Sequence, residues 1–151
     1  MPILTPPPSS PSPSATVARY FQALNAKDTG ALEEVYAKSA HFDDNVFHYK
    51  DRDGIVGMWS KLPADARVEH EIVKVDGNTV VANLHWSYTL AGTKVKNDET
   101  STLTVVDGKI VKQREHFDFG VWAHQLAPWF SVASLNRHEW LLAPVLFHFG
   151  G

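Results

Sequence analysis

Hydrophobic and polar positions in the first part of the chain follow the period of an α-helix. Apolar Val17, Phe21 and Leu24 recur at spacings of four and three, the pattern of an amphipathic helix. Ser14 stands just before them and is predicted to cap this helix, and Thr29 is predicted to cap a second one. The sequence therefore predicts two consecutive helices before residue 40.

The period changes to two in the middle of the chain. A short, strand-like segment is predicted over 40–49, and a third helix is predicted to start at Asp53 and to stop before Pro63. Strands are predicted over 68–75, 79–90, 96–106 and 109–119, with turns at Asp76-Gly77-Asn78 and Asp107-Gly108. Helices followed by antiparallel strands predict an α+β fold, with the helices packed on one face of a curved sheet.

Two of these strands differ in how clearly they show a buried face. In 79–90 the even positions, from Val80 to Leu90, are mostly apolar and are predicted to face the core. In 109–119 neither parity is cleanly apolar. One parity carries Ile110, Lys112, Arg114, His116 and Asp118, and the other carries Val111, Gln113, Glu115, Phe117 and Phe119. A strand with polar residues on both faces often lines a wet cavity or a subunit interface, and the sequence leaves open which parity points inward.

The two ends of the chain have distinctive compositions. Six of the 9 prolines lie in the first 13 residues, so 1–14 is predicted to be a disordered, polyproline-like leader. This leader lacks the basic and apolar regions of a signal peptide. A folded domain is predicted over 15–125. The segment 126–151 is predicted to be an aromatic extension that packs on the domain or on a dimer partner. Helices are predicted around 121–126 and 134–142.

Composition excludes several classes of function. The 151 residues carry 14 Lys and Arg against 17 Asp and Glu, and this net charge of −3 argues against a nucleic-acid partner. Cysteine is absent, which excludes a disulfide framework and a thiolate metal site. No paired-histidine motif predicts a metal site, and no Gly-rich phosphate loop predicts a nucleotide cofactor. No segment is long and apolar enough to span a membrane, and a cytoplasmic location is expected.

Five segments together resemble a known superfamily. They are Val17–Asp28, Ala31–Tyr36, Ala40–Asp44, Lys50–Gly57 and His116–Trp122. The chain is similar, over roughly residues 15–125, to the nuclear transport factor 2-like superfamily, in the branch of ketosteroid isomerases and SnoaL-like polyketide cyclases. The resemblance implies a cone: helices in the concave face of a strongly bent, mostly antiparallel sheet, around an internal pocket. It also implies chemistry without a cofactor.

The resemblance implies roles for particular residues. Tyr20 falls at the position of the isomerases' tyrosine donor to the substrate oxygen, and Asp44 falls on their general base. Ser101 takes the position of a protonated aspartic acid in their oxyanion hole, with two acids just upstream. SnoaL-like cyclases use an acid in the late strands, for which Asp118 is nearest. The Arg-x-Asp spacing of this fold's epoxide hydrolases is missing, which argues against that branch.

The residues also have chemistry of their own. A carboxylate in an apolar pocket has a raised pKa and can act as a base, so Asp44 is a candidate base or else a solvated loop acid. Tyr20 is an oxyanion donor or a core residue. His116 and Asp118, two positions apart on one strand face, are a catalytic or a structural pair. Candidate ligand-binding residues, which can equally fill a core, are His48, Trp59, Trp86, Tyr88, Ser101 and Trp122.

Together these observations predict a small enzyme that works without a cofactor. Its reaction is expected to be proton abstraction with isomerisation, cyclisation or hydration and elimination of a hydrophobic, carbonyl-type small molecule. The catalytic candidates are Asp44, Tyr20, His116 and Asp118. A homodimer is expected. The alternative is a non-catalytic ligand-binding or dimerisation domain of the same fold.

Overall fold

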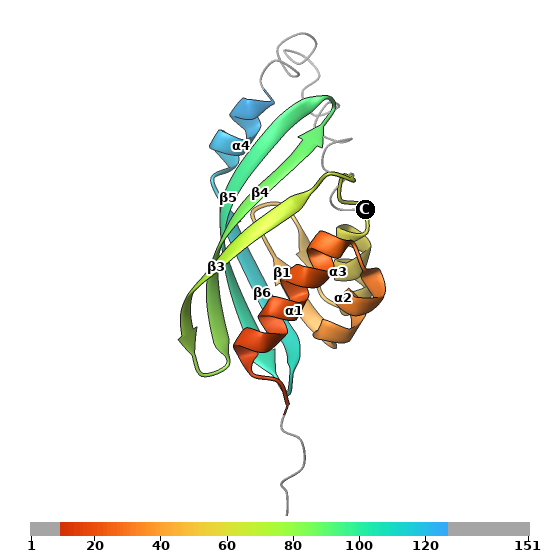
Figure 1. Ribbon diagram of the computed structural model, residues 1–151, viewed down its shortest axis with the longest axis vertical. Coiled ribbons are helices and arrows are strands. Elements are labelled where there is room, and N and C mark those ends of the chain that lie inside the picture. Colours follow the sequence, from red (N-terminus) through yellow and green to blue (C-terminus); the bar gives the residue numbers. More distant parts are fainter. Residues whose placement is uncertain (1–9, 127–151) are drawn as a thin grey trace, which may run out of the picture.

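A six-stranded, strongly curved sheet and the helices packed against it form the structure. The computed structural model describes residues 10–126 (Figure 1). The helices are α1 (Pro13–Ala26), α2 (Thr29–Val35), α3 (Arg52–Trp59) and α4 (Phe119–Gln125). The strands are β1 (Tyr36–Asp43), β2 (His48–Tyr49), β3 (Arg67–Asp76), β4 (Thr79–Leu90), β5 (Thr93–Val106) and β6 (Lys109–Phe117). The predicted α+β class is confirmed.

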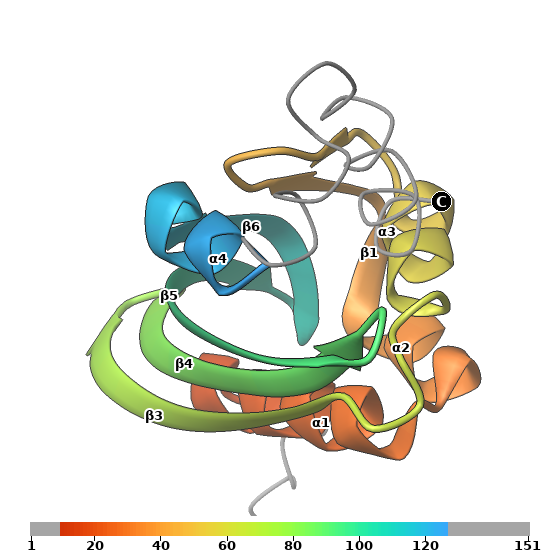
Figure 2. The ribbon, with the colours of Figure 1, turned by 90° about the horizontal axis from the view of Figure 1, so that it is seen from above.

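The sheet has the order β2-β1-β6-β5-β4-β3, and all neighbours run antiparallel except β1 and β6, which are parallel. It curls so that β6 and β1 stand across from β3 and β4 when the molecule is seen from above (Figure 2). Helix α1 packs against β3 to β6, α3 packs against β1, and α4 packs against β5. The buried side chains of these elements form one continuous hydrophobic core.

The helix caps lie earlier than predicted. Ser12 rather than Ser14 caps α1, with its Oγ accepting a hydrogen bond from the Ala15 amide at 3.2 Å. The first helical residue is a proline, which is favoured there because an amide proton would have no intrahelical partner. Asp28 and Asp51 cap α2 and α3, one and two positions before the predicted residues. The prediction of Ser14 as the cap is therefore wrong.

The strand predictions hold best where the burial pattern alternates cleanly. Strand β4 has the predicted bounds, and its even positions from Val80 to Leu90 are all buried, which confirms the predicted core face. The turns at Gly77 and Gly108 have positive φ angles of 58° and 75°, which glycine adopts without strain. Strand β5 begins at Thr93, three residues earlier than predicted, since the hairpin turn before it is tight.

A bulge in β6 explains why its sequence shows no apolar face. Val105 of β5 faces Ile110, but the next pair along is Thr104 and Lys112, so Val111 is an extra residue. The bulge switches the inward parity: Ile110 is buried before it, and positions 113, 115 and 117 are buried after it. Both parities therefore contribute to the inside, and the parity with Gln113 and Glu115 lines the interior toward the end of the strand.

Part of the predicted organisation lies outside the described residues. It comprises residues 1–9 of the predicted leader and 127–151 of the predicted aromatic extension, including the helix predicted around 134–142. A helix is present where one was predicted around 121–126, as α4. Within residues 10–126, no helix has both the length and the hydropathy needed to cross a membrane.

Candidate functional site

A cavity opens among α3, α4, the β1–β2 turn and the inward faces of β4, β5 and β6. It encloses about 560 Å³, its open mouth included. Its wall is mostly apolar and aromatic, with four polar residues and no lysine, arginine or histidine among the described residues. The lining residues are Asp44, Val46, Phe47, Met58, Trp59, Leu62, Trp86, Tyr88, Asn97, Glu99, Glu115, Phe117 and Trp122.

The sheet register places two glutamates beside each other in this cavity. Inward positions of β5 are the odd ones, so Asn97, Glu99 and Ser101 point inside together with the apolar residues of that face. Across the β5–β6 ladder, Ser101 pairs with Glu115, and Glu99 pairs with Phe117. Glu99 and Glu115 are therefore diagonal neighbours on one face of the sheet, a spacing at which long side chains meet.

Burial disfavours the ionised form of both glutamates. Burial raises the pKa of Glu115 to about 7, while the hydrogen bond from Gln113 opposes this shift. Burial also holds the pKa of Glu99 well above its usual range, and the charge of Glu115 adds to that effect. Glu99 accepts a 2.8 Å hydrogen bond from Asn97 Nδ2 and is itself hydrogen-bonded to Glu115. Because two adjacent buried carboxylates repel each other, the pair keeps at least one proton at neutral pH.

A buried amide fixes the position of Glu115. Gln113 is fully buried, and its Nε2 donates to Glu115 Oε2 at 3.1 Å and to the Tyr20 hydroxyl at 2.9 Å. The Tyr36 hydroxyl donates to Gln113 Oε1 and accepts a 3.1 Å hydrogen bond from Trp59 Nε1. Burial raises the pKa of both tyrosines, so they stay protonated. This network fixes which way the amide points and hence the rotamer of the glutamate.

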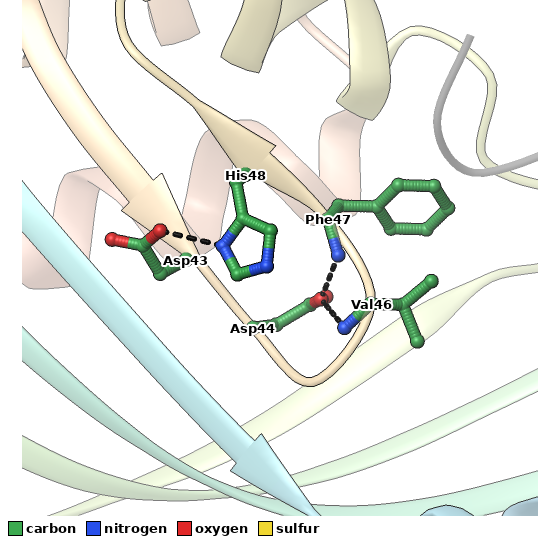
Figure 3. Close-up of polar contacts among 5 residues, drawn as sticks. All are labelled: Asp43, Asp44, Val46, Phe47 and His48. Carbon is green, nitrogen blue, oxygen red and sulfur yellow. Dashed lines mark hydrogen bonds and ion pairs between the residues drawn. The ribbon is translucent and has the colours of Figure 1, made fainter.

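Asp44 enters the cavity from the turn between β1 and β2. Its Oδ1 accepts hydrogen bonds from the amides of Val46 at 2.7 Å and Phe47 at 2.6 Å (Figure 3). Asn45 ties the turn to β6, because its side chain exchanges hydrogen bonds of 2.9 and 3.0 Å with the Phe117 backbone. Burial raises the pKa of Asp44, and the two amide donors limit that rise. The turn therefore holds a partly buried carboxylate beside the glutamate pair.

The three carboxyl groups have different environments, and this decides what they can do. Asp44 has amide donors that stabilise its anion, which makes it a proton acceptor. Glu99 and Glu115 hold a proton that can be donated. Within residues 10–126, no group of three or more histidine, aspartate and glutamate side chains is placed to hold a metal ion. The arrangement suits an acid and a base acting on one organic molecule.

Five of the residues predicted from the sequence line this cavity. They are Asp44, Trp59, Trp86, Tyr88 and Trp122. Tyr20 and Ser101 are fully buried and do not line it. Tyr20 is connected to Glu115 by hydrogen bonds through Gln113, and Ser101 lies opposite Glu115 in the β5–β6 ladder. The structure thus brings seven of the predicted residues to or next to the cavity.

Three other predicted residues lie away from it. His48 Nδ1 is 2.7 Å from Asp43 Oδ1 on the exposed side of the β1–β2 hairpin (Figure 3). His116 is exposed on the outward face of β6. The predicted shared strand face of His116 and Asp118 is wrong, because β6 ends at Phe117 and the Asp118 carboxylate caps α4, accepting from the Val121 amide at 3.0 Å.

Sequence reasoning missed four functional side chains, on two strands. On β5 a parity signal was present: Val95, Leu103 and Val105 mark the odd positions as the inward ones, so polar residues of that parity are buried. On β6 the signal was hidden by the bulge at Val111. The missed residues are Asn97, Glu99, Gln113 and Glu115.

Comparison with known proteins gives one family match. The sequence model of a family described as a SnoaL-like domain matches residues 17–113, which is more than half of the chain. A search of the curated proteins finds no match to this sequence.

Several solved structures have a similar fold. A Mycobacterium tuberculosis LEH-like epoxide hydrolase is 16% identical with a TM-score of 0.67, over 91% of this chain and 99% of that one. IdmH, a polyketide cyclase candidate from Streptomyces antibioticus, is 21% identical with a TM-score of 0.64, over 76% and 98%. A cyclase candidate from Sinorhizobium meliloti is 27% identical with a TM-score of 0.57, over 66% and 92%. These similarities agree with the nuclear transport factor 2-like cone predicted from the sequence.

Proposed function

The chain belongs to the SnoaL-like domain family, and we propose that it is a cofactor-independent enzyme that transfers a proton within a hydrophobic, carbonyl-type small molecule. One observation carries this proposal: a base-type carboxylate, Asp44, and a proton-holding pair, Glu99 and Glu115, line the same aromatic cavity. The names of IdmH and the Sinorhizobium meliloti protein, both cyclase candidates, fit carbon-acid chemistry of this kind. Reaction outcomes within this class are isomerisation, ring closure and elimination.

The geometry supports a two-part mechanism. Asp44 takes a proton from a carbon next to the substrate carbonyl, and the C–H electron pair moves onto the carbonyl oxygen as an enolate. The glutamate pair donates a hydrogen bond to that oxygen and stabilises its developing charge. The enolate carbon system then takes the proton back from Asp44 at another carbon, or its carbon attacks a second carbonyl to close a ring. In the second case the C=O π pair moves onto that oxygen, which takes the proton from Asp44. Both groups work in a cavity whose wall is mostly apolar and aromatic, which limits their hydration.

The other predicted residues have supporting roles or none in this mechanism. Tyr20 is a positioning residue, because it reaches Glu115 only through Gln113. Ser101 lies directly opposite Glu115 in the β5–β6 ladder, beside the site but not in the cavity lining. His48, His116 and Asp118 lie away from the cavity and have no part in the reaction as we propose it.

Deuterium exchange tests the mechanism without knowledge of the natural substrate. The probe is 2-tetralone, a flat hydrophobic ketone, and loss of its α-proton signal in D₂O is followed by NMR. We expect Asp44→Asn and Glu99→Gln each to slow the catalysed exchange by about 10²–10⁴-fold, the usual contribution of a general acid or base. Asp98→Asn, next to Glu99 but exposed and facing outward, is the matched control and should leave the rate unchanged. Equal rates in all four proteins would refute the proposal and favour the non-catalytic binding domain.

The pH dependence of this exchange should be bell-shaped. The rate rises as Asp44 loses its proton, at a pH above the ordinary pKa of 3.8 because burial raises that value. It falls again near pH 7, because Glu115 then ionises and the one remaining proton of the pair is held between the two carboxylates. A rate that keeps rising through pH 8 would show that the pair is not the donor.

A further inference from the structure

The polar groups that line the cavity are rich in hydrogen-bond acceptors and poor in donors. Asp44, Glu99 and Glu115 contribute six carboxyl oxygens, and among residues 10–126 no cationic side chain lines the cavity to balance their charge. The fourth polar residue of the lining, Asn97, already donates a hydrogen bond to Glu99 Oε2. A cavity of this kind stabilises a ligand that carries donors and positive charge, and it repels an anionic one.

The aromatic walls support the same conclusion independently of the carboxylates. Trp59 Nε1 donates to the Tyr36 hydroxyl, and Trp122 Nε1 donates to the Tyr88 hydroxyl at 2.6 Å. The indole donors of Trp59 and Trp122 are therefore used inside the protein, so at these two residues a ligand in the cavity meets ring surface. Trp59 and Trp86 are nearly parallel, with an interplanar angle of 15° and centroids 5.9 Å apart. Indole rings attract cations through the negative potential of their faces.

We propose that the natural ligand of this cavity is a hydrophobic amine that binds as its ammonium ion, with the nitrogen near the glutamate pair and the hydrocarbon part among the tryptophans. This inference deepens the proposed function and rests on it for one point only, that the ligand is also the substrate. The substrate class is then an amino-carbonyl compound rather than a neutral ketone or a keto acid. The acidic residues alone do not indicate this ligand class. The aromatic residues and the carboxylates line the same cavity, so one molecule can contact both.

An ammonium group at this position also explains how the pair could act as a donor at neutral pH. The carboxyl group of Glu99 is hydrogen-bonded to Glu115. An ammonium ion beside Glu115 supplies N–H donors and charge in place of that hydrogen bond. The Glu99 hydroxyl is then free to turn to a carbonyl oxygen of the same ligand.

Binding of three probes to the full chain tests the inference. They are 2-phenylethylamine, 2-phenylethanol and 3-phenylpropionate, which are cationic, neutral and anionic and share a phenyl ring on a short chain. Affinity is measured by calorimetry and by quenching of tryptophan fluorescence. We expect the amine to bind about tenfold or more tightly than the alcohol, and the carboxylate to bind more weakly than either. Equal affinity for amine and alcohol, or tighter binding of the carboxylate, would overturn the inference.

Charge-removing variants locate the binding site. Glu115→Gln should abolish the preference for the amine over the alcohol while keeping the alcohol's affinity. Glu71→Gln is the matched control, because Glu71 is exposed on the outward side of β3, and it should bind all three probes like the wild type. Loss of amine preference in both variants, or in neither, would contradict the assigned site.

A measurement on the wild type keeps the test decisive if Glu115→Gln does not fold. 2-Phenylethylamine stays protonated between pH 6 and 8, whereas Glu115 gains its negative charge in this range. The affinity for the amine should therefore rise with pH, while the affinity for 2-phenylethanol should not. The titratable groups around Glu115 are Glu99 on β5, Asp44 in the β1–β2 turn, and the tyrosines Tyr20 and Tyr36. Burial keeps both tyrosines protonated throughout, so the change reports the carboxyl groups. A flat amine affinity would overturn the inference.

Failure of the amine inference and failure of the proposed function give different results. Exchange of 2-tetralone by the wild type, lost in Asp44→Asn, supports proton transfer whichever probe binds best. Amine preference without exchange of either 2-tetralone or 4-(aminomethyl)acetophenone, a ketone that carries the ammonium group, supports the ligand class and rejects the enzyme. Exchange without amine preference rejects the ligand class alone.

Discussion

The inward and outward faces of β5 and β6 carry similar residues with opposite properties. Asp98 and Glu99 are neighbours in sequence, yet Asp98 points to solvent and Glu99 into the cavity. Outside, Asp98 Oδ1 is 2.7 Å from His85 Nδ1, and both side chains are more than half exposed, at 83% and 57%. Inside, Glu99 meets Glu115, which is only 4% exposed.

The difference shows that solvent, more than residue type, sets the chemistry of these carboxyl groups. Outside, a hydrogen bond to Asp98 raises the pKa of His85. Water screens such exposed pairs, so they contribute little to folding. Inside, burial raises the pKa of both glutamates, and each depends on a neutral donor, Asn97 or Gln113. A carboxyl group that holds a proton at neutral pH is therefore available only on the inner face.

Removing the inner amide should have the largest effect on stability. Gln113→Leu leaves the buried hydroxyls of Tyr20 and Tyr36, and Glu115, without a hydrogen-bond partner at that point. We expect the free energy of unfolding to fall by about 3–5 kcal/mol, since each unsatisfied buried group costs about 1–3 kcal/mol. Urea unfolding measures it. Lys112→Leu, the adjacent outward-facing change, should cost less than about 0.5 kcal/mol, and equal losses would contradict the contrast between the faces.

The pH dependence of stability should distinguish Glu115 from outward-facing acids. Its folded-state pKa of about 7 lies above the ordinary 4.5, so the folded protein binds the extra proton. The resulting stabilisation is complete below pH 4.5 and is lost as pH rises through 7, about 3 kcal/mol in all. Glu115→Gln should remove this loss, so the variant gains relative to the wild type between pH 4.5 and 8. Chemical denaturation at several pH values tests it, with Glu71→Gln as the control that should follow the wild type.

The two sides of α4 allow a smaller test of the same contrast. Trp122 donates to the Tyr88 hydroxyl inside, while Gln125 exchanges hydrogen bonds of 2.8 and 2.6 Å with the Lys96 backbone at the surface. Trp122→Phe keeps most of the ring but removes the buried donor, which should cost about 1–2 kcal/mol. Gln125→Ala should cost less, since water can replace its bonds. Thermal unfolding compares them, and a larger loss for Gln125→Ala would contradict this expectation.

The outer ion pair should show the smallest effect. Asp98→Asn should leave the unfolding midpoint unchanged, because both members of the pair are exposed. It should lower the pKa of His85 toward its usual value of 6.5, since the hydrogen bond to Asp98 is what raises it. A proton NMR titration of the histidine ring measures this shift. A clear loss of stability would show that the outward face contributes more than its exposure suggests.

Most of the fold was predictable because apolar periodicity follows the burial of regular elements. Strand β4 has the predicted bounds and face, since each of its even positions packs into the core. Helix starts were displaced by one or two positions, because Ser12 and Ser14, like Asp51 and Asp53, are equally good caps by residue type. The end of β6 was misplaced for a similar reason: Asp118 reads as a strand residue until the helix after it is known.

The candidate site was predictable only in part. Asp44 and the tryptophans follow from their residue types and from the family resemblance. Glu99 and Glu115 break the rule that inward residues are apolar, and such buried charges are concentrated at functional sites. The bulge at Val111 then hid the parity of β6. A single extra residue cannot be located from a sequence pattern that is polar on both sides.

The ionisation of the inner glutamates can be measured directly by ¹³C NMR of the glutamate side-chain carboxyl groups between pH 3 and 10, with Glu99→Gln and Glu115→Gln assigning the signals. If the inner face holds a proton, one of these two carboxyl signals titrates near pH 7 and the other stays protonated well above the ordinary pKa of 4.5. If both titrate near 4.5, like glutamates in water, the inner face has no proton to donate and the proposed mechanism is wrong.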